Sequence, residues 1–518
     1  MIRIKINNKE IKVEEGTSVM NAAKAVGVDI PAMCWHEELE HFTSCMVCMV
    51  KDTKTGNLIP SCSVKAEEGM QITTMDNEIK EARKTAIELL LSEHVGDCEA
   101  PCQIACPAHM DIPKMNRLIE EGKLEESLEI VMQDIALPSV LGRICPAPCE
   151  GACHRKTIDE PVSICLLKRI VGDHAGDSFF ANLLIQPSNR EKIAIIGAGP
   201  AGLAAAFYLQ IRGYNCSIFE KGEKPGGFLR SEKLDEKLPV EVLEKEITNL
   251  LSTGIKLKLN EEITLSGFNE LQAEYDALII ATGTGGDKLK EWGFDVNAKG
   301  IEITQGTYET SINGVFAIGN SLKPSRLAIR SVGQGKEVAF SVDQYLNSNK
   351  VTGEPRLFNS KFGRLIAEEY PEYIKESNDH KRLHPAKGLE EGFSKEEAMT
   401  EAARCLHCDC RKFDNCTLRD LSEEYKANQR RFSYGVRKNV QKYINHDLVI
   451  FEPQKCIKCG ICVRLTEKHG ERFGFTFIGR GFDVVIGVPF NEELKDGIVK
   501  TAKIVVDGCP TGALSMKK

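Results

Sequence analysis

The chain has 518 residues, more than one compact domain usually holds. Its formal net charge of −8 argues against nucleic-acid binding, because a phosphate backbone attracts a basic surface. The chain has 20 cysteines, and it shows neither a secretory signal nor a run of about eighteen apolar residues. We therefore expect a cytoplasmic protein of several domains, in which thiols bind metals instead of forming disulfides.

Alternating apolar residues predict a small β-rich domain at the start of the chain. Isoleucine occupies every second position of the segment Ile2–Ile6, which is typical of a strand with one buried face. Thr17 or Ser18 can cap a short helix after the second strand. A longer helix is predicted over residues 77–93, where apolar residues recur on one face.

The remaining regions differ in composition. Residues 94–177 predict helices joined by cysteine-rich loops, and the polar stretch 349–393 is interpreted as a linker. Ser394 begins a capping-box pattern, which predicts a short helix that ends at Cys405. The predicted domain boundaries are 1–76, 77–187, 188–348, 349–424 and 425–518.

The first cysteine group has the spacing Cys34-x10-Cys45-x2-Cys48-x13-Cys62. Short spacings of this kind deliver several thiolates to one point, as an iron–sulfur cluster requires. The group resembles the N-terminal [2Fe–2S] ferredoxin domain of the large iron–sulfur subunit of NADH:ubiquinone oxidoreductase and of iron-only hydrogenases. That resemblance implies a β-grasp fold, and a zinc site is the alternative.

A second group lies in residues 96–172 and contains the motifs Cys106-Pro107 and Cys145-Pro146. It resembles the helical two-cluster domain of the glutamate synthase small subunit and of dihydropyrimidine dehydrogenase. The resemblance implies two [4Fe–4S] clusters with interleaved ligands. The implied ligands are Cys98, Cys102 and Cys153 for one cluster, and Cys106, Cys145 and Cys149 for the other.

Each of these two clusters lacks a fourth ligand that matches the family. His94 stands where the family has a cysteine, and His94-x3-Cys98 also resembles the start of a histidine-ligated cluster in the complex I subunit. A structural histidine is the alternative. For the other cluster, Lys168 lies near the family's position, but an ammonium cannot ligate. Cys165, one helical turn earlier, is the predicted ligand, with a buried thiol as the alternative.

Two further groups lie in the C-terminal part of the chain. The third group, Cys405-x2-Cys408-x1-Cys410-x5-Cys416, can enclose one [4Fe–4S] cluster, and zinc is again the alternative. The fourth group follows the pattern of a two-cluster ferredoxin, in which the fourth cysteine of each motif ligates the other cluster. Thr466 stands at the position of that fourth cysteine in the first motif, and the second motif keeps only its last cysteine, so the remaining cysteines make one complete site. These cysteines are Cys456, Cys459, Cys462 and Cys509. Their segment resembles the ferredoxin part of complex I and formate dehydrogenase large subunits.

A glycine-rich turn follows the predicted strand Lys192–Ile196. It has the form Gly-x-Gly-x-x-Gly and opens a helix, and the next strand ends in Glu220. This order predicts a pyrophosphate at the helix N-terminus and a ribose hydroxyl on the carboxylate, with a turn that binds nothing as the alternative. Three later motifs resemble the FAD domain of the glutamate synthase small subunit. The predicted FAD residues are Gly197, Gly199, Pro200, Ala201, Gly202, Glu220, Gly226, Gly227, Thr282, Gly283, Gly319 and Asn320.

Those relatives insert a second dinucleotide-binding domain, for NAD(P)H, between the two halves of the FAD domain. In this chain the segment between Gly283 and Gly314 is too short to hold such a domain, and no second glycine-rich fingerprint occurs. We therefore expect FAD binding without a nicotinamide site. The isolated Cys216 lies in an apolar strand and is predicted to be a core residue.

These patterns predict a multidomain α/β plus α+β protein, with a β-grasp [2Fe–2S] ferredoxin, a helical two-cluster domain, a Rossmann-like FAD domain and a C-terminal [4Fe–4S] ferredoxin-like domain. The predicted function is an oxidoreductase subunit that relays electrons between FAD, one [2Fe–2S] cluster and about four [4Fe–4S] clusters. We predict no catalytic residue beyond the ligands. The expected partners are other redox subunits, such as a flavin-bearing NADH-oxidising subunit or a ferredoxin, with no nucleic acid and no membrane span.

Two other functions remain as alternatives at this level. One is a glutamate-synthase-type small subunit that supplies electrons to an amidotransferase, and the other is a non-catalytic iron–sulfur scaffold or redox sensor. The basic run Gln429–Lys442 is interpreted either as a docking face for an acidic ferredoxin or as an ordinary solvated surface.

Overall fold

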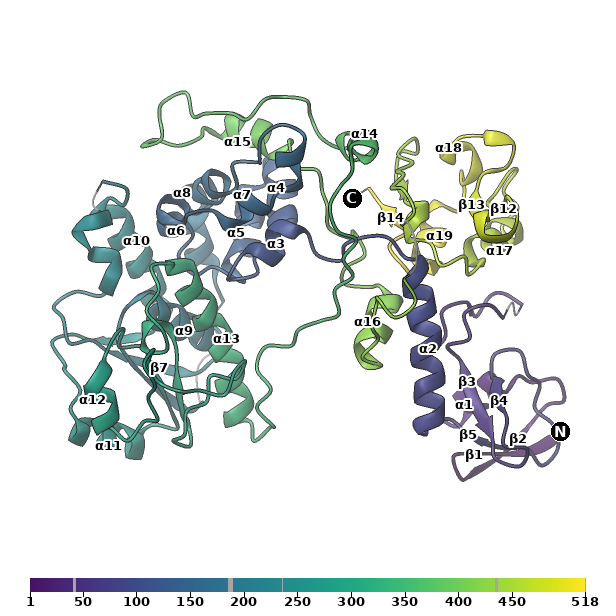
Figure 1. Ribbon diagram of the computed structural model, residues 1–518, viewed down its shortest axis with the longest axis horizontal. Coiled ribbons are helices and arrows are strands. Elements are labelled where there is room, and N and C mark those ends of the chain that lie inside the picture. The colour runs from purple at the N-terminus through teal and green to yellow at the C-terminus, as the bar shows by residue number, and fades with distance from the viewer. Residues whose placement is uncertain (41–42, 185–189, 235, 434–436, 518) are drawn as a thin grey trace. The chain divides into compact units, whose positions relative to one another are not determined.

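The computed structural model describes residues 1–40, 43–184, 190–234, 236–433 and 437–517. The chain forms two compact units (Figure 1). The first unit contains residues 1–99, 357–375 and 408–518, and the second contains residues 100–356 and 376–407. The expected linker therefore contributes residues 357–375 to the first unit. None of the helices in the described part combines the length and the apolar character that a membrane crossing needs.

A five-stranded mixed sheet begins the first unit, in the order β2-β1-β5-β3-β4. Strand β1 runs parallel to β5 and antiparallel to β2. Helix α1 (Val19–Ala25) begins after Ser18, whose hydroxyl accepts the N–H of Asn21 at 3.2 Å. The alternating Ile4 and Ile6 side chains are buried in the core below this helix, as their spacing predicts. The strands are β1 (Ile2–Ile6), β2 (Lys9–Val13), β3 (Met49–Asp52), β4 (Leu58–Pro60) and β5 (Gln71–Thr73).

The rest of the first unit consists of short helices and two small sheets. Helix α2 (Asn77–Glu93) matches the predicted helix, and the Asp76 carboxylate caps it by accepting the N–H of Ile79 at 2.8 Å. Antiparallel strands pair as β11 with β14 and as β12 with β13. The other elements are α14 (Tyr370–Ile374), α16 (Thr417–Glu424), β11 (Val449–Phe451), α17 (Ile461–Lys468), β12 (Thr476–Ile478), β13 (Val485–Gly487), α18 (Leu494–Gly497), α19 (Ala502–Gly508) and β14 (Leu514–Met516).

The second unit begins with a helical layer. Helices α5 and α6 pack on the long helix α8, and α15 packs on α4. Helix α15 starts with the predicted capping box, in which Ser394 and Glu397 exchange hydrogen bonds of 3.2 and 2.8 Å. The helices are α3 (Pro101–Ala105), α4 (Ile112–Glu120), α5 (Leu124–Met132), α6 (Pro138–Ile144), α7 (Pro148–Ala152), α8 (Ile164–Asn182) and α15 (Lys395–Ala402).

A parallel sheet forms the other layer of the second unit, in the order β10-β9-β6-β7-β8. Helices α9 and α13 pack so closely at Gly335 that a Cβ on this residue would lie only 2.8 Å from the Ala201 carbonyl oxygen. The strands are Lys192–Ile196, Asn215–Phe219, Lys256–Lys258, Ala277–Ile280 and Val315–Ala317 (β6–β10). The helices are α9 (Pro200–Gln210), α10 (Val240–Leu251), α11 (Leu265–Glu274), α12 (Gly286–Glu291) and α13 (Ala328–Leu346).

Candidate flavin and iron–sulfur sites

The glycine-rich turn between β6 and α9 is closely packed on one side and open on the other. A Cβ on Gly197 would lie 2.5 Å from the Ala281 carbonyl oxygen, and one on Gly202 would lie 2.0 Å from the Gly197 carbonyl oxygen. At Gly199, by contrast, a Cβ would have no heavy atom within 4 Å. The turn therefore leaves free space in front of the N-terminus of α9, where backbone N–H groups favour a phosphate.

Glu220 holds this turn from the end of β7. Its carboxylate accepts the N–H of Ala198 at 2.8 Å and the N–H of Gly222 at 2.9 Å. The same residue lines a cavity of about 260 Å³ at the carboxyl ends of the strands, which is where open α/β sheets bind ligands. The carboxylate thus both orders the loop and faces the space that a nucleotide would occupy.

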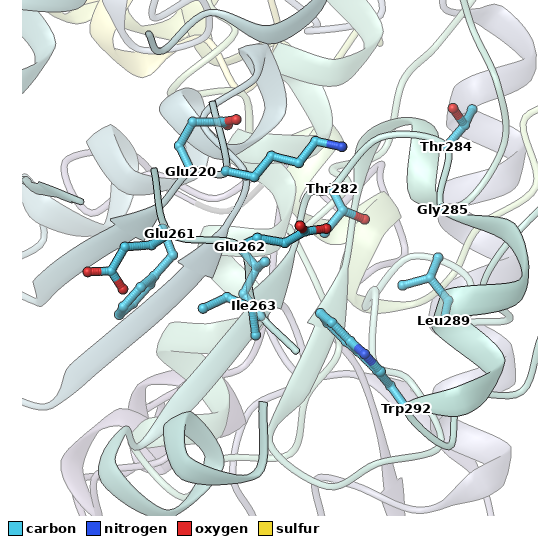
Figure 2. Close-up of a pocket in the computed structure, with 13 residues that line it drawn as sticks. Glu220, Glu261, Glu262, Ile263, Thr282, Thr284, Gly285, Leu289 and Trp292 are labelled. Carbon is cyan, nitrogen blue, oxygen red and sulfur yellow. The ribbon is translucent and has the colours of Figure 1, made fainter. Parts of the chain in front are cut away.

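Figure 2 shows the side chains around this cavity, including Glu220, Thr282 and Trp292. The Thr282 hydroxyl is buried without a hydrogen-bond partner in the described structure. Buried polar atoms are normally paired, so this orphaned hydroxyl is consistent with a ligand contact. Sequence reasoning missed Trp292 and Glu262 as lining residues, because neither belongs to a recognisable motif.

The remaining predicted FAD residues surround the same turn. The N–H of Gly226 donates to the Ala198 carbonyl at 2.8 Å, and a Cβ on Gly227 would lie 3.1 Å from the Gly199 Cα. Asn320 instead exchanges two hydrogen bonds with the backbone of Ser325, at 3.0 and 3.1 Å. Its side chain is thus engaged in a local turn, and its predicted contact to a ribityl chain stays a prediction. Pro200 and Ala201 begin α9, Gly283 follows β9, and Gly319 follows β10.

The four cysteines of the first group converge in the N-terminal domain, where all are buried. Hydrogen bonds from the thiols of Cys45 and Cys62 lower the pKa of Cys34. The Cys62 thiol likewise lowers the pKa of Cys48 to about 7. Backbone N–H groups of Met33 and Val47 donate to the Cys45 sulfur at 3.4 and 3.5 Å. Converging sulfurs with N–H donors suit a [2Fe–2S] cluster, whose potential such bonds tune.

The cysteines of the fourth group also come together. Cys456, Cys459, Cys462 and Cys509 line one small enclosed space. Burial raises the pKa of the Cys456 thiol to about 11, and the Lys458 N–H donates to its sulfur at 3.3 Å. The structure therefore brings Cys509 to the three closely spaced cysteines, as the sequence predicts for one [4Fe–4S] site.

In the second unit, Cys165 joins Cys106, Cys145 and Cys149. Its thiol forms hydrogen bonds with those of Cys145 and Cys149. The Lys168 amine is buried in the same place: burial opposes its charge, but these sulfurs raise its pKa, with Cys165 contributing most. Cys165 therefore lies beside Cys145 and Cys149 with a cation nearby, and its role as the fourth ligand stays a prediction.

The boundary between the two units passes through the third cysteine group. Cys405 belongs to the second unit, whereas Cys408, Cys410 and Cys416 belong to the first. Burial raises the pKa of Cys153, and the nearby Cys405 thiolate raises it further. Cys102 lies on α3, which packs on the helix that ends at Cys153. The single site expected for these four adjacent cysteines stays a prediction.

Cys98 lies in the first unit with Cys410 and Cys416. Burial raises its pKa to about 12, and these two thiols contribute to the shift. His94 is also buried in this unit, and burial lowers its pKa to about 4. Cys216 lies buried on β7, as predicted for a core residue. In the described part of the chain, no three His, Cys, Asp or Glu side chains are arranged to hold a single metal ion.

Several basic side chains of the run Gln429–Lys442 form ion pairs within the first unit. Arg431 pairs with Glu88, and Lys438 pairs with Glu93. Arg437 pairs with Glu369, whose side chain is fully buried. Residues 434–436 lie outside the described residues. These ion pairs make the run a structural element of the unit and argue against a free docking face.

Three family models match consecutive parts of the chain. Residues 1–77 match a 2Fe-2S iron-sulfur cluster binding domain, residues 63–178 match dihydropyrimidine dehydrogenase domain II with a 4Fe-4S cluster, and residues 179–335 match a pyridine nucleotide-disulphide oxidoreductase domain. Over residues 1–335 the chain is built from iron–sulfur and flavin-type oxidoreductase domains. This finding confirms the predicted presence of iron–sulfur clusters and FAD as cofactor classes.

Several curated proteins are similar to this chain. The NADPH-Fe(3+) oxidoreductase subunit beta of Geobacter sulfurreducens is 37% identical over 210 residues, 39% of this chain and 30% of that protein. Subunit PreT of the NAD-dependent dihydropyrimidine dehydrogenase of Salmonella typhimurium is 38% identical over 36% of this chain and 46% of its own length. The glutamate synthase [NADPH] small chain of Bacillus subtilis is 36% identical over 203 residues, which are 36% of this chain and 40% of that protein.

The chain therefore spans less than half the length of these relatives. Their names confirm the predicted resemblance to the glutamate synthase small subunit and to dihydropyrimidine dehydrogenase. All three are named as subunits or chains of oxidoreductases, which agrees with the predicted class of protein and with the expectation of redox partner subunits.

Proposed function

We propose that this chain is an electron-transfer subunit that passes electrons between FAD and a series of iron–sulfur clusters. The observation that carries this proposal is the succession of cysteine sites in the first unit. Cys34 is close enough to Cys459 to affect its pKa, and Cys509 affects that of Cys416 in the same way. The Cys416 sulfur also lies 3.9 Å from the Pro510 carbonyl oxygen. Neighbouring sites of this kind suit one-electron transfer between clusters.

The proposed cofactors are one [2Fe–2S] cluster, about four [4Fe–4S] clusters and one FAD. In this proposal residues 1–76 form a β-grasp ferredoxin and residues 188–348 form the FAD domain. Residues 77–187, 349–424 and 425–518 carry the [4Fe–4S] sites. The cytoplasmic location also stays part of the proposal, because the chain is rich in thiols.

FAD accepts two electrons and exchanges them singly, which links hydride chemistry to the clusters. The residues of this chain would bind and orient it: the turn at Gly199 leaves room for the pyrophosphate, Glu220 fixes the turn, and the Thr282 hydroxyl offers an unpaired polar contact. The short connection between β9 and β10 supports the absence of a separate nicotinamide domain. We therefore propose that a partner subunit, of the NADH-oxidising or ferredoxin type, supplies or removes the electrons.

Similarity to a glutamate synthase small chain favours a second candidate, in which the electrons go to an amidotransferase. That candidate accounts for the helical and FAD domains but leaves the cysteine sites at both ends of the chain without a role. The two candidates differ in the partner that the chain binds.

The test is anaerobic purification of the full chain followed by iron, sulfide and flavin analysis. We expect iron with an equal amount of labile sulfide, bound FAD, and bleaching by dithionite but not by NADH or NADPH. Zinc in place of iron would contradict the proposal, and so would bleaching of the flavin by NADPH without a partner. Co-purification with an amidotransferase would favour the second candidate.

A further inference from the structure

The chain leaves the first unit after Glu99 and enters it for the last time at Cys408. Two contacts fix these distant segments to each other. The N–H of Cys410 donates to the carbonyl of Cys98 at 3.1 Å. The Arg419 guanidinium pairs with the Glu99 carboxylate at 3.2 Å, and both side chains are buried. The segment that ends at Glu99 and the segment that begins at Cys408 are therefore bound to each other within the first unit.

Three cysteine sulfurs gather at this junction. The Cys98 sulfur accepts the N–H of Ser360 at 3.4 Å, and its thiol interacts electrostatically with those of Cys410 and Cys416. A Cβ on Gly512 would lie 2.3 Å from the Cys410 sulfur, so the backbone at this glycine packs directly against that sulfur. All three thiols are buried, as structural ligands of a cluster are.

A buried histidine lies next to Lys455, a residue that influences one of these sulfurs. His94 is buried, and its Nδ1 lies 3.0 Å from the Lys455 carbonyl oxygen. A carbonyl can only accept, so Nδ1 carries the proton and Nε2 carries the lone pair. Proteins commonly orient ligating histidines through such a carbonyl bond. The Lys455 amine, in turn, interacts electrostatically with Cys410, so Lys455 links His94, through its carbonyl, to the surroundings of that sulfur.

We propose that His94, Cys98, Cys410 and Cys416 ligate one [4Fe–4S] cluster, whose ligands come from two segments separated by the whole second unit. This inference rests on the proposed function and assigns a ligand set to it. Cys405 is then free to join Cys153 and Cys102 in the second unit. We leave Cys408 outside the proposed set, because Cys410 and Cys416 contribute to the electrostatic surroundings of Cys98, whereas Cys408 contributes to those of Tyr373.

The proposed ligand set also places this cluster next to the cysteine site of the fourth group. Cys416 is the member of this set that lies beside Cys509 and Pro510. The proposed cluster would therefore neighbour the site of Cys456, Cys459 and Cys462. The buried Lys455–Glu452 pair, at 2.6 Å, adjoins the set and adds a fixed cation near Cys410.

The experiment uses the full chain, purified anaerobically and reduced with dithionite, and reads the cluster signals by electron paramagnetic resonance. We expect the variants Cys98→Ala, Cys410→Ala and Cys416→Ala to lose one and the same signal and about four irons per chain. Cys405→Ala and Cys153→Ala should lose a different signal, and Cys408→Ala should keep the first. The [2Fe–2S] signal of the Cys34 group reports in every variant that the first unit is folded.

The histidine is tested separately with His94→Cys. A thiolate can replace the imidazole, so we expect the cluster signal to persist, its nitrogen hyperfine coupling to vanish and its midpoint potential to fall, because thiolate adds negative charge. Nitrogen coupling that persists in this variant would overturn the assignment of His94. Loss of one common signal in Cys98→Ala and Cys405→Ala would overturn the grouping. A wild-type chain without iron would instead refute the proposed function itself.

Discussion

Arg83 on α2 donates a hydrogen bond of 3.0 Å to the hydroxyl of Tyr425, which lies 342 positions further along the chain. Its other guanidinium nitrogens donate to the Met49 carbonyl at 3.0 and 2.9 Å and to the Thr74 carbonyl at 3.0 Å. The arginine is 1% exposed. It therefore ties the N-terminal sheet, α2 and the C-terminal part of the first unit together.

We predict that Arg83→Met destabilises the first unit by about 2–4 kcal/mol, because it leaves buried carbonyl groups without donors. Urea unfolding followed through the [2Fe–2S] absorbance would measure the change. The exposed Arg480 provides the control, since Arg480→Met should leave the midpoint unchanged. Equal midpoints for Arg83→Met and wild type would refute this role.

Gly199→Ala tests the flavin site without disturbing the fold. The added methyl meets no heavy atom within 4 Å and therefore occupies the space expected for the pyrophosphate. We predict at least a tenfold loss of bound FAD, equivalent to about 1.4 kcal/mol, with an unchanged melting temperature of the flavin-free chain.

The matched control is Gly176→Ala in α8, where the nearest atom to an added Cβ is 3.8 Å away. This variant should retain its flavin, and replacing a helical glycine should stabilise the helix slightly. Full FAD content in Gly199→Ala, measured by fluorescence after release, would show that the pyrophosphate lies elsewhere.

Cys165→Ala tests the fourth ligand of the helical domain. We expect the chain to lose the cluster of Cys106, Cys145 and Cys149, because three thiolates hold a [4Fe–4S] cluster poorly. Iron analysis and electron paramagnetic resonance would measure this loss. Cys216→Ala is the control, since Cys216 is buried on β7 and only burial raises its pKa. Identical iron content in the two variants would exclude Cys165 as a ligand.

The buried amine of Lys168 should raise the reduction potential of the same cluster. A cation near the sulfurs stabilises the reduced, more negative state, so Lys168→Met should lower the midpoint potential, on the order of 100 mV for a charge about 6 Å away at an effective dielectric constant of about 20. A redox titration followed by electron paramagnetic resonance measures the shift. Lys290→Met, at an exposed position on α12, should leave the potential unchanged.

We predict that Glu246 on α10 makes the free energy of unfolding depend on pH. Burial raises its pKa from 4.5 to about 7, although its carboxyl accepts the N–H groups of Ser139 and Val140 at the start of α6. Asp173, which pairs with Arg143, contributes to the increase. As the pH rises from 4.5 towards 7, the unfolded carboxyl releases its proton while the folded one retains it. The free energy of unfolding therefore falls over this range, by at most about 3 kcal/mol.

Glu246→Gln should remove that fall, because the amide does not titrate. Urea midpoints measured between these pH values for the wild type and the variant provide the comparison. Glu241→Gln, at an exposed position of the same helix, should keep the wild-type profile. A wild-type stability that rises with pH across this range would contradict the prediction.

Local patterns predicted the local structure well. The alternation of Ile2–Ile6, the capping box at Ser394 and the glycine turn after β6 each depend on residues a few positions apart. Each element begins where its pattern predicts, although the helix after Ser394 ends at Ala402 and not at Cys405. The convergence of Cys456, Cys459 and Cys462 follows equally from their spacing. In these cases the chain geometry within one or two turns fixes which groups meet.

The sequence by itself determined which residues are suited to hold clusters and FAD, because thiol chemistry and glycine turns are local properties. Only the tertiary structure decided which distant cysteines lie near one another. Cys98 lies near Cys410 and Cys416 in the first unit, and Cys405 lies near Cys153 in the second, because the chain leaves the first unit at Glu99 and later returns to it. No spacing rule predicts such partners, since the packing of distant segments, and not the connectivity between neighbouring residues, sets the distance between their sulfurs.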